Sequence, residues 1–231
     1  RMASLSLAAG ASVTFQGWDS PLSADDLTIG GTLTHLDHLS VTETNALGQW
    51  VTLHRVYLAG SNITIAAGAQ VNADGKGYPR NAGPGGSKTS RDGGGHAGLG
   101  GSGYLAPGGG GLPYGDPVHP FQPGSGGGEP TKGREGGGVI RIEADGHLAV
   151  DGVLSANGVN GAVSHGGGGS GGSIWLSCRT FGGAATGRVR AQGGSGNAQG
   201  GGGSGGRLAL YYETIDQAAL SEPVPPVQFN G

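Results

Sequence analysis

The chain has 231 residues, of which 55 are glycine, 6% are aromatic and 13% are charged. Glycine at this density is typical of disordered chains, but apolar runs such as 139–142 and 207–212 recur between the glycine tracts and predict a folded domain. The net charge of −3 and the lack of a Lys/Arg cluster argue against nucleic acid as a partner. The sequence contains no run of about 18 apolar residues, so it predicts no membrane-spanning helix and no membrane partner.

The single cysteine, Cys178, excludes a disulfide framework and a zinc site built from cysteine pairs. We expect it to be a buried, unreactive thiol. Residues 1–4 lack the basic-then-apolar pattern of a signal peptide. Secretion of the protein is therefore expected on indirect grounds and not from a signal peptide.

Short strands joined by glycine turns are predicted from the N-terminus onward. Residues 5–13 (LSLAAGASV) match residues 63–71 (ITIAAGAQV) position for position, and variants occupy 27–33 and 148–154. Each unit alternates apolar with small or polar residues, which is the period of a β-strand. Leu5 and Leu27 lie 22 residues apart, a spacing typical of one coil of a solenoid.

A long insertion follows the strand near Val71 and covers about residues 76–137. Long loops on a rigid scaffold commonly carry function, so its tyrosines Tyr78, Tyr104 and Tyr114 are candidate ligand contacts. The alternative is that part of the loop, around 114–121, packs as a small core against the sheet. In the first half of the chain Trp18 and Trp50 are further candidates, although Trp50 could instead cap the solenoid.

A second repeat occupies the C-terminal half, where Ile140, Ile174 and Leu208 recur every 34 residues. The glycine tracts between these strands are expected to form either tight turns or packed polyglycine strands held by backbone hydrogen bonds. If the three repeated apolar residues point inward, alternation sends the intervening side chains outward. Stacking of the coils then predicts two outward ladders: Arg141, Trp175 and Ala209 in the first, and Glu143, Ser177 and Tyr211 in the second.

Trp175 and Tyr211 would therefore lie close together on one flat face, beside Arg141 and Glu143. Aromatic rings cover the apolar face of a sugar while charged groups hydrogen-bond its hydroxyls, so this face is a candidate polysaccharide site. The alternative is that the insertion folds over the sheet and Trp175 is an ordinary core residue.

These patterns predict an all-β fold, a right-handed parallel β-helix with glycine-rich loops and one long insertion. Residues 1–219 would form a single domain, with a helical turn at 214–220 as a C-terminal cap. The Pro-rich residues 220–231 are typical of a linker or tail, which predicts that the domain belongs to a longer modular protein.

Catalytic motifs are not recognisable in the sequence. Its acidic residues form no paired-carboxylate motif, and the set Glu129, Lys132, Arg134 and Glu135 is interpreted as a solvated charge run. His35, His38 and His54 could cluster on neighbouring coils but are expected to be surface histidines. We therefore predict no enzyme activity, no cofactor and no metal, since no motif indicates calcium.

The succession of Tyr114-Gly-Asp, Gly-Gly-Gly-Val139-Ile-Arg-Ile, Gly-Gly-Ser173-Ile-Trp-Leu and Gly-Gly-Arg207-Leu-Ala-Leu-Tyr-Tyr resembles glycine-rich β-helical segments of large bacterial extracellular proteins. The resemblance spans about residues 60–213. It is most similar in kind to the family 89 carbohydrate-binding modules, which are attached to xylanases of gut bacteria and bind xylan.

That resemblance implies a secreted, non-catalytic module that binds xylan or a related plant polysaccharide and targets an attached glycoside hydrolase. Two other functions stay open at this point. The chain could be a structural or adhesive spacer of a bacterial surface protein, or a small β-helical polysaccharide lyase or hydrolase.

Overall fold

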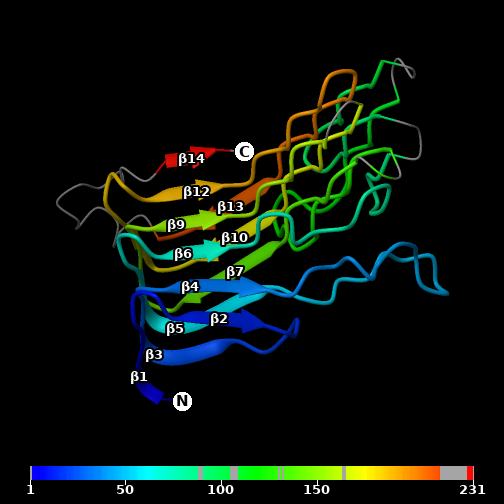
Figure 1. Cartoon of the computed structure of the whole chain (residues 1–231). Helices are drawn as coiled ribbons and strands as arrows, with labels where there is room; N and C mark the ends of the chain where they lie inside the picture. The colour runs from blue at the N-terminus through cyan, green and yellow to red at the C-terminus, as the bar shows by residue number, and fades with distance from the viewer. Residues whose placement is uncertain are drawn as a thin grey trace.

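The computed structural model describes residues 2–87, 91–104, 109–129, 131, 133–162, 165–213 and 228–230. Within these residues there is no α-helix, and the β-strands form two sheets in which every pair is parallel (Figure 1). The predicted all-β class is confirmed. No helix in the described ranges is long and apolar enough to span a membrane.

The chain alternates between the two sheets, so each passage through both adds one coil to a solenoid-like stack. Sheet A contains β1 (Met2–Leu7), β3 (Leu22–Ile29), β5 (Val56–Ile65), β7 (Val139–Ala144), β8 (His147–Val150), β10 (Ser173–Ser177), β11 (Thr180–Gly182) and β13 (Arg207–Tyr211). Sheet B contains β2 (Ser12–Phe15), β4 (Thr32–His35), β6 (Gln70–Asn72), β9 (Val153–Ser155), β12 (Arg188–Arg190) and β14 (Gln228–Asn230).

The pairing of strands follows the sequence repeats. Leu5 pairs with Leu27, Leu27 with Ile63, and Ile63 with Leu148, so the four units of the first repeat stack in one column. The 34-residue repeat is stacked in the same way, because Ile174 of β10 pairs with Ile140 of β7 on one side and with Leu208 of β13 on the other. Both repeats therefore mark successive coils, as predicted.

The space between the sheets is filled by aliphatic side chains. Leu27, Ile63 and Leu148 project from sheet A and are at most 1% exposed, while Leu33 and Leu154 project from sheet B and are completely buried. Burial of a large aliphatic side chain contributes about 1.5–3 kcal/mol, so a narrow stack of short strands can be stable without a large aromatic core. Cys178 is buried as expected, and desolvation raises the pKa of its thiol to about 12.

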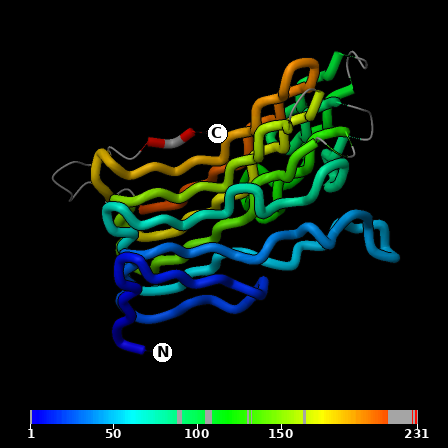
Figure 2. Tube along the Cα trace, viewed as in Figure 1, coloured from blue at the N-terminus to red at the C-terminus, as the bar shows by residue number. Residues whose placement is uncertain are grey.

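Glycine-rich segments lie beyond the strands, between the ends of sheet B and the beginnings of sheet A, where they run side by side (Figure 2). We call them the glycine bundle, which comprises residues 93–96, 124–128, 133–138, 156–161, 166–172, 192–196 and 200–206. The insertion between β6 and β7 forms no strand in its described part, and its glycine segments belong to this bundle.

Backbone hydrogen bonds hold the glycine bundle together with a period of three residues. In its central segment the N–H groups of 167 and 170 donate to segment 124–128, those of 168 and 171 to 200–206, and those of 169 and 172 to 156–161. A three-residue period with hydrogen bonds only to neighbouring segments is the geometry of the polyproline II helix. Of the two alternatives for the glycine tracts, packed polyglycine strands are therefore the one observed.

The close approach of these segments requires glycine. A Cβ atom placed on Gly169 would lie 1.9 Å from the carbonyl oxygen of Glu135, and one on Gly168 would lie 2.1 Å from that of Gly194. Neither distance is compatible with a side chain.

His35 and His38 are completely buried, so the expectation that they are surface residues was wrong. In His35, Nε2 accepts from the N–H of Val139 and Nδ1 contacts the carbonyl of Leu36 at 2.6 Å. In His38, Nε2 accepts from the N–H of Leu53 and Nδ1 contacts the carbonyl of Lys76. Each ring therefore tethers loop backbone as a neutral imidazole, and desolvation lowers the pKa values to about 3 and about 4 respectively.

At the C-terminus, β14 pairs in parallel with β12 inside the segment that was expected to be a linker or tail. The helical turn expected at 214–220, and with it the boundary between 219 and 220, lies outside the described residues.

Candidate functional site

The outer face of sheet A carries the two ladders that the repeat predicts. Trp175 pairs with Arg141 and Ala209, and Ser177 pairs with Glu143 and Tyr211. The rings of Trp175 and Tyr211 lie 6.1 Å apart. The prediction that Trp175 and Tyr211 lie close together on the outer face is confirmed.

The ladder continues beyond Arg141 into earlier coils. Tyr57 of β5 pairs with Arg141, and Arg55 lies two residues before it on the same face. The result is a continuous series of contacts that we call the aromatic–arginine row: Trp18, Arg55, Tyr57, Arg141, Trp175, Tyr211 and His119.

Guanidinium groups and aromatic rings alternate along most of this row. The Cζ atom of Arg55 lies 4.5 Å from the ring centroid of Trp18 and 4.6 Å from that of Tyr57. The Cζ atom of Arg141 lies 4.9 Å from Tyr57 and 5.1 Å from Trp175. Such distances are within the range of cation–π attraction, so each cation is held between two rings.

Local sequence explains how the row is built. Val56 and Leu58 of β5 are completely buried, so strand alternation turns Tyr57 outward together with Arg55. Trp18 comes from the short loop between β2 and β3, which is tied to β5 because the N–H of Arg55 donates to the carbonyl of Gly17 at 3.4 Å. The loop before β3 and the start of β5 thus contribute adjacent side chains to one face.

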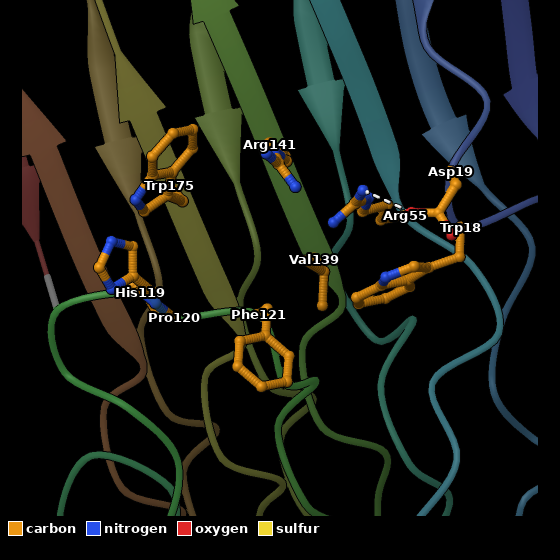
Figure 3. Close-up of a pocket in the computed structure, with 9 residues that line it drawn as sticks. All are labelled: Trp18, Asp19, Arg55, His119, Pro120, Phe121, Val139, Arg141 and Trp175. Carbon is orange, nitrogen blue, oxygen red and sulfur yellow. Dashed lines mark hydrogen bonds and ion pairs between the residues drawn. The ribbon is translucent and has the colours of Figure 1, made fainter.

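A hollow of about 240 Å³ opens among these side chains at the N-terminal ends of the sheet A strands (Figure 3). Trp18 and Trp175 lie on opposite sides of the hollow, with the guanidinium groups of Arg55 and Arg141 between them. The remaining lining residues are Asp19, His119, Pro120, Phe121 and Val139.

The insertion contributes one wall of the hollow. His119 stacks on Tyr211 at 6.1 Å, and the Tyr211 hydroxyl donates to the carbonyl of Val118 at 2.6 Å. Phe121 remains 46% exposed at the edge of the hollow, and Trp175 is only half-buried. The insertion therefore lies beside the outer face that carries Trp175. Both alternatives for Trp175 are met in part, because its ring is partly exposed and the insertion lies next to it.

Arg55 is the most deeply buried charge of the row, with 3% of its surface exposed. Its Nη2 donates to Asp19 at 3.2 Å, yet the Asp19 side chain is 86% exposed. Burial lowers the pKa of the Arg55 guanidinium, and the positive charge of Arg141 lowers it further. Arg55 Nε and Trp175 Nε1 are buried and have no hydrogen-bond partner within the described part of the chain.

Glu143 is the acidic partner of two side chains of the row. It accepts from Nε of Arg141 at 3.1 Å and from the hydroxyl of Tyr57. Burial raises the pKa of Tyr57 first, and the bond to Glu143 raises it further, so the phenol stays a donor.

Four of the candidate residues lie away from both the hollow and the strands of sheet A. Tyr78 is completely buried and its ring contacts Trp50 at 5.4 Å, so Tyr78 is a packing residue and its prediction as a ligand contact was wrong. Tyr114 stacks on His96, and its hydroxyl donates to the carbonyl of Pro123 at 2.5 Å. The fourth, Tyr104, is 70% exposed but stands apart from the aromatic–arginine row.

Sequence reasoning missed Arg55, Tyr57 and the wall at 118–121 as parts of the site. The signal for the first two was present, because the same alternation that faces Arg141 outward also faces Tyr57 outward. No comparable periodicity places Asp19 or Phe121, which come from loops.

Among the described residues, no group of three or more His, Cys, Asp or Glu side chains could hold a metal ion. Lys132, one member of the charge run formed with Glu129, Arg134 and Glu135, lies outside the described residues.

Comparisons with protein-family models, with curated proteins and with solved structures found no match. The case for a function therefore rests on the geometry of the aromatic–arginine row.

Proposed function

We propose that the chain is a secreted, non-catalytic carbohydrate-binding module that binds a plant polysaccharide, with xylan as the leading ligand, and directs an attached glycoside hydrolase to it. The observation that carries the proposal is the placement of Trp18 and Trp175 on opposite sides of a hollow with two guanidinium groups between them. Aromatic rings cover the apolar faces of sugars, and arginine N–H groups donate to their oxygens.

The shape of the site supports a long ligand. Pockets that engulf small molecules usually measure about 300–1,000 Å³. A hollow of about 240 Å³ is smaller than this range and would accommodate one segment of a longer chain.

The proposed scaffold is a right-handed parallel β-helix, of which sheets A and B are two faces. Crossover connections between parallel strands of one sheet are almost always right-handed, which supports this hand. Rigid coils keep the row in place, so a ligand does not have to order these side chains.

The carboxylates of the site support binding rather than hydrolysis. A general acid for glycoside cleavage is a carboxyl group held in an apolar environment, opposite a second free carboxylate. Asp19 is instead 86% exposed, and Glu143 is occupied by Arg141 and Tyr57.

Affinity electrophoresis of the purified chain in gels containing xylan, mixed-linkage glucan or pectin tests the proposal. We expect xylan to retard the chain, and Trp175→Ala to lose most of that retardation because it removes one of the two rings proposed to cover the sugar. Tyr104→Ala is the matched control, since it removes an exposed ring outside the row.

Absence of retardation in every gel would overturn the binding proposal and favour the spacer function. Release of new reducing or unsaturated sugar ends would overturn the non-catalytic assignment. If Tyr104→Ala lost binding while Trp175→Ala kept it, the site would lie around Tyr104 and not on the aromatic–arginine row.

A further inference from the structure

The two arginines of the row place like charges around a single ring. The Cζ atoms of Arg55 and Arg141 lie 4.6 and 4.9 Å from the ring centroid of Tyr57, and both residues line the hollow. The positive charge of Arg141 lowers the pKa of the buried Arg55 guanidinium, so the two cations repel each other. A negative charge placed in the hollow would attract both groups and offset that repulsion.

The protein's own carboxylates occupy only part of the hydrogen-bonding capacity of the two arginines, since Glu143 takes Nε and Nη2 of Arg141 and Asp19 takes Nη2 of Arg55. Asp19 reaches only Nη2 of Arg55, and an exposed carboxylate of this kind is largely screened by solvent. Glu143 approaches Arg141 from the next outward position of β7 and lines a different hollow, together with Asp145 and Ser177. Arg55 Nε remains buried and without a partner in the described part of the chain.

We propose that the hollow binds the carboxylate of a uronic acid residue, so that the chain prefers an acidic polysaccharide to the corresponding neutral one. This inference rests on the proposed function and specifies the ligand class for the same site. The planar guanidinium group presents paired N–H donors that match the two oxygens of a carboxylate. The rings of Trp18 and Trp175 cover the neighbouring pyranose faces, while the carboxylate lies between Arg55 and Arg141.

Calorimetric titration of the full chain with two matched ligands tests this inference. The first is a xylo-oligosaccharide that carries a glucuronic acid branch, and the second is the same molecule after reduction of its carboxyl group to a hydroxymethyl group. We expect reduction to weaken binding about tenfold or more, which corresponds to about 1.4 kcal/mol. Added salt should weaken binding of the acidic ligand more than that of the reduced ligand.

A third ligand, an oligogalacturonate, carries the same carboxylate on a pectin-type backbone. Its binding identifies the source of the uronic acid. Tighter binding of the glucuronic acid ligand than of its reduced form supports the inference. The stronger of the two acidic ligands indicates the polysaccharide.

Arg141→Gln removes one of the two charges, and Arg190→Gln makes the same charge change on β12 of the other sheet. We expect the first variant to lose the preference for the acidic ligand and the second to keep it. The comparison of acidic and reduced ligands uses the wild-type chain, so the inference can still be tested if Arg141→Gln does not fold.

Equal binding of acidic and reduced oligosaccharides would overturn this inference and leave polysaccharide binding intact. Failure of all three oligosaccharides to bind would overturn the proposed function, and this inference with it.

Discussion

Tyr57 links the two cations of the site, because the guanidinium groups of Arg55 and Arg141 both lie against its ring. Its hydroxyl donates to Glu143, which also holds Arg141. Individual cation–π contacts contribute about 0.5–2 kcal/mol, depending on how far the pair is removed from water. The four contacts made by Arg55 and Arg141 therefore fix both side chains before a ligand arrives.

The buried histidines make the stability of the fold depend on pH. His35 and His38 use Nε2 as an acceptor, so protonation would break the bonds to Val139 and Leu53. Their pKa values are about 3 and about 4 in the folded chain, below the ordinary value of 6.5. Between these values only the unfolded chain takes up the proton, so stability falls as pH falls from 6.5 toward 4.

We expect the free energy of unfolding, measured by denaturant titration, to decrease by about 1.4 kcal/mol per pH unit for each buried histidine below pH 6.5. His38→Gln should remove the contribution of one proton from this pH dependence. The same pH slope in wild type and His38→Gln would contradict the buried, neutral state of His38.

Strand order and pairing could be predicted from the sequence because aliphatic residues recur once per coil. The 22-residue spacing of Leu5 and Leu27 and the 34-residue spacing of Ile140, Ile174 and Leu208 translate directly into paired positions. Alternation within each strand then fixed the outward ladder through Trp175. Side-chain patterns determine these features, which is why sequence reasoning recovered them.

The neighbours within the glycine bundle could not be predicted, since glycine has no side chain whose pattern could identify a partner. Each segment is placed by backbone hydrogen bonds that any glycine tract could form. The burial of His35 and His38 was missed for a related reason, because their partners are backbone groups of distant loops.

Two glycines of similar sequence context provide a test of the glycine bundle. A Cβ atom on Gly169 would lie 1.9 Å from the carbonyl oxygen of Glu135, whereas one on Gly202 would have its nearest neighbour at 3.6 Å. We expect Gly169→Ala to lower the free energy of unfolding by about 3 kcal/mol or more, because overpacking forces the segments apart. Gly202→Ala should be neutral or stabilising by up to about 1 kcal/mol, since alanine restricts the unfolded chain.

Thermal and denaturant unfolding of the two variants beside wild type provide the measurement. Equal stability of Gly169→Ala and Gly202→Ala would show that the segments are not packed as closely as described.

At the scale of the whole molecule, the solenoid and the glycine bundle have different roles at one site. Sheet A presents Arg55, Tyr57, Arg141 and Trp175 from successive coils. The insertion starts and ends at the glycine bundle and brings residues 118–121 against Tyr211 and the hollow. The bundle thereby anchors a loop that the strands alone would leave without support.

The three tryptophans allow the central claim, polysaccharide binding at the aromatic–arginine row, to be tested in one spectrum. Trp18 and Trp175 line the hollow, whereas Trp50 packs on Tyr78 elsewhere. Titration of ¹⁵N-labelled chain with xylo-oligosaccharides, with and without a glucuronic acid branch, should shift the indole N–H signals of Trp18 and Trp175 saturably and leave that of Trp50 in place. No shift with either ligand, or a shift confined to Trp50, would contradict polysaccharide binding at the row.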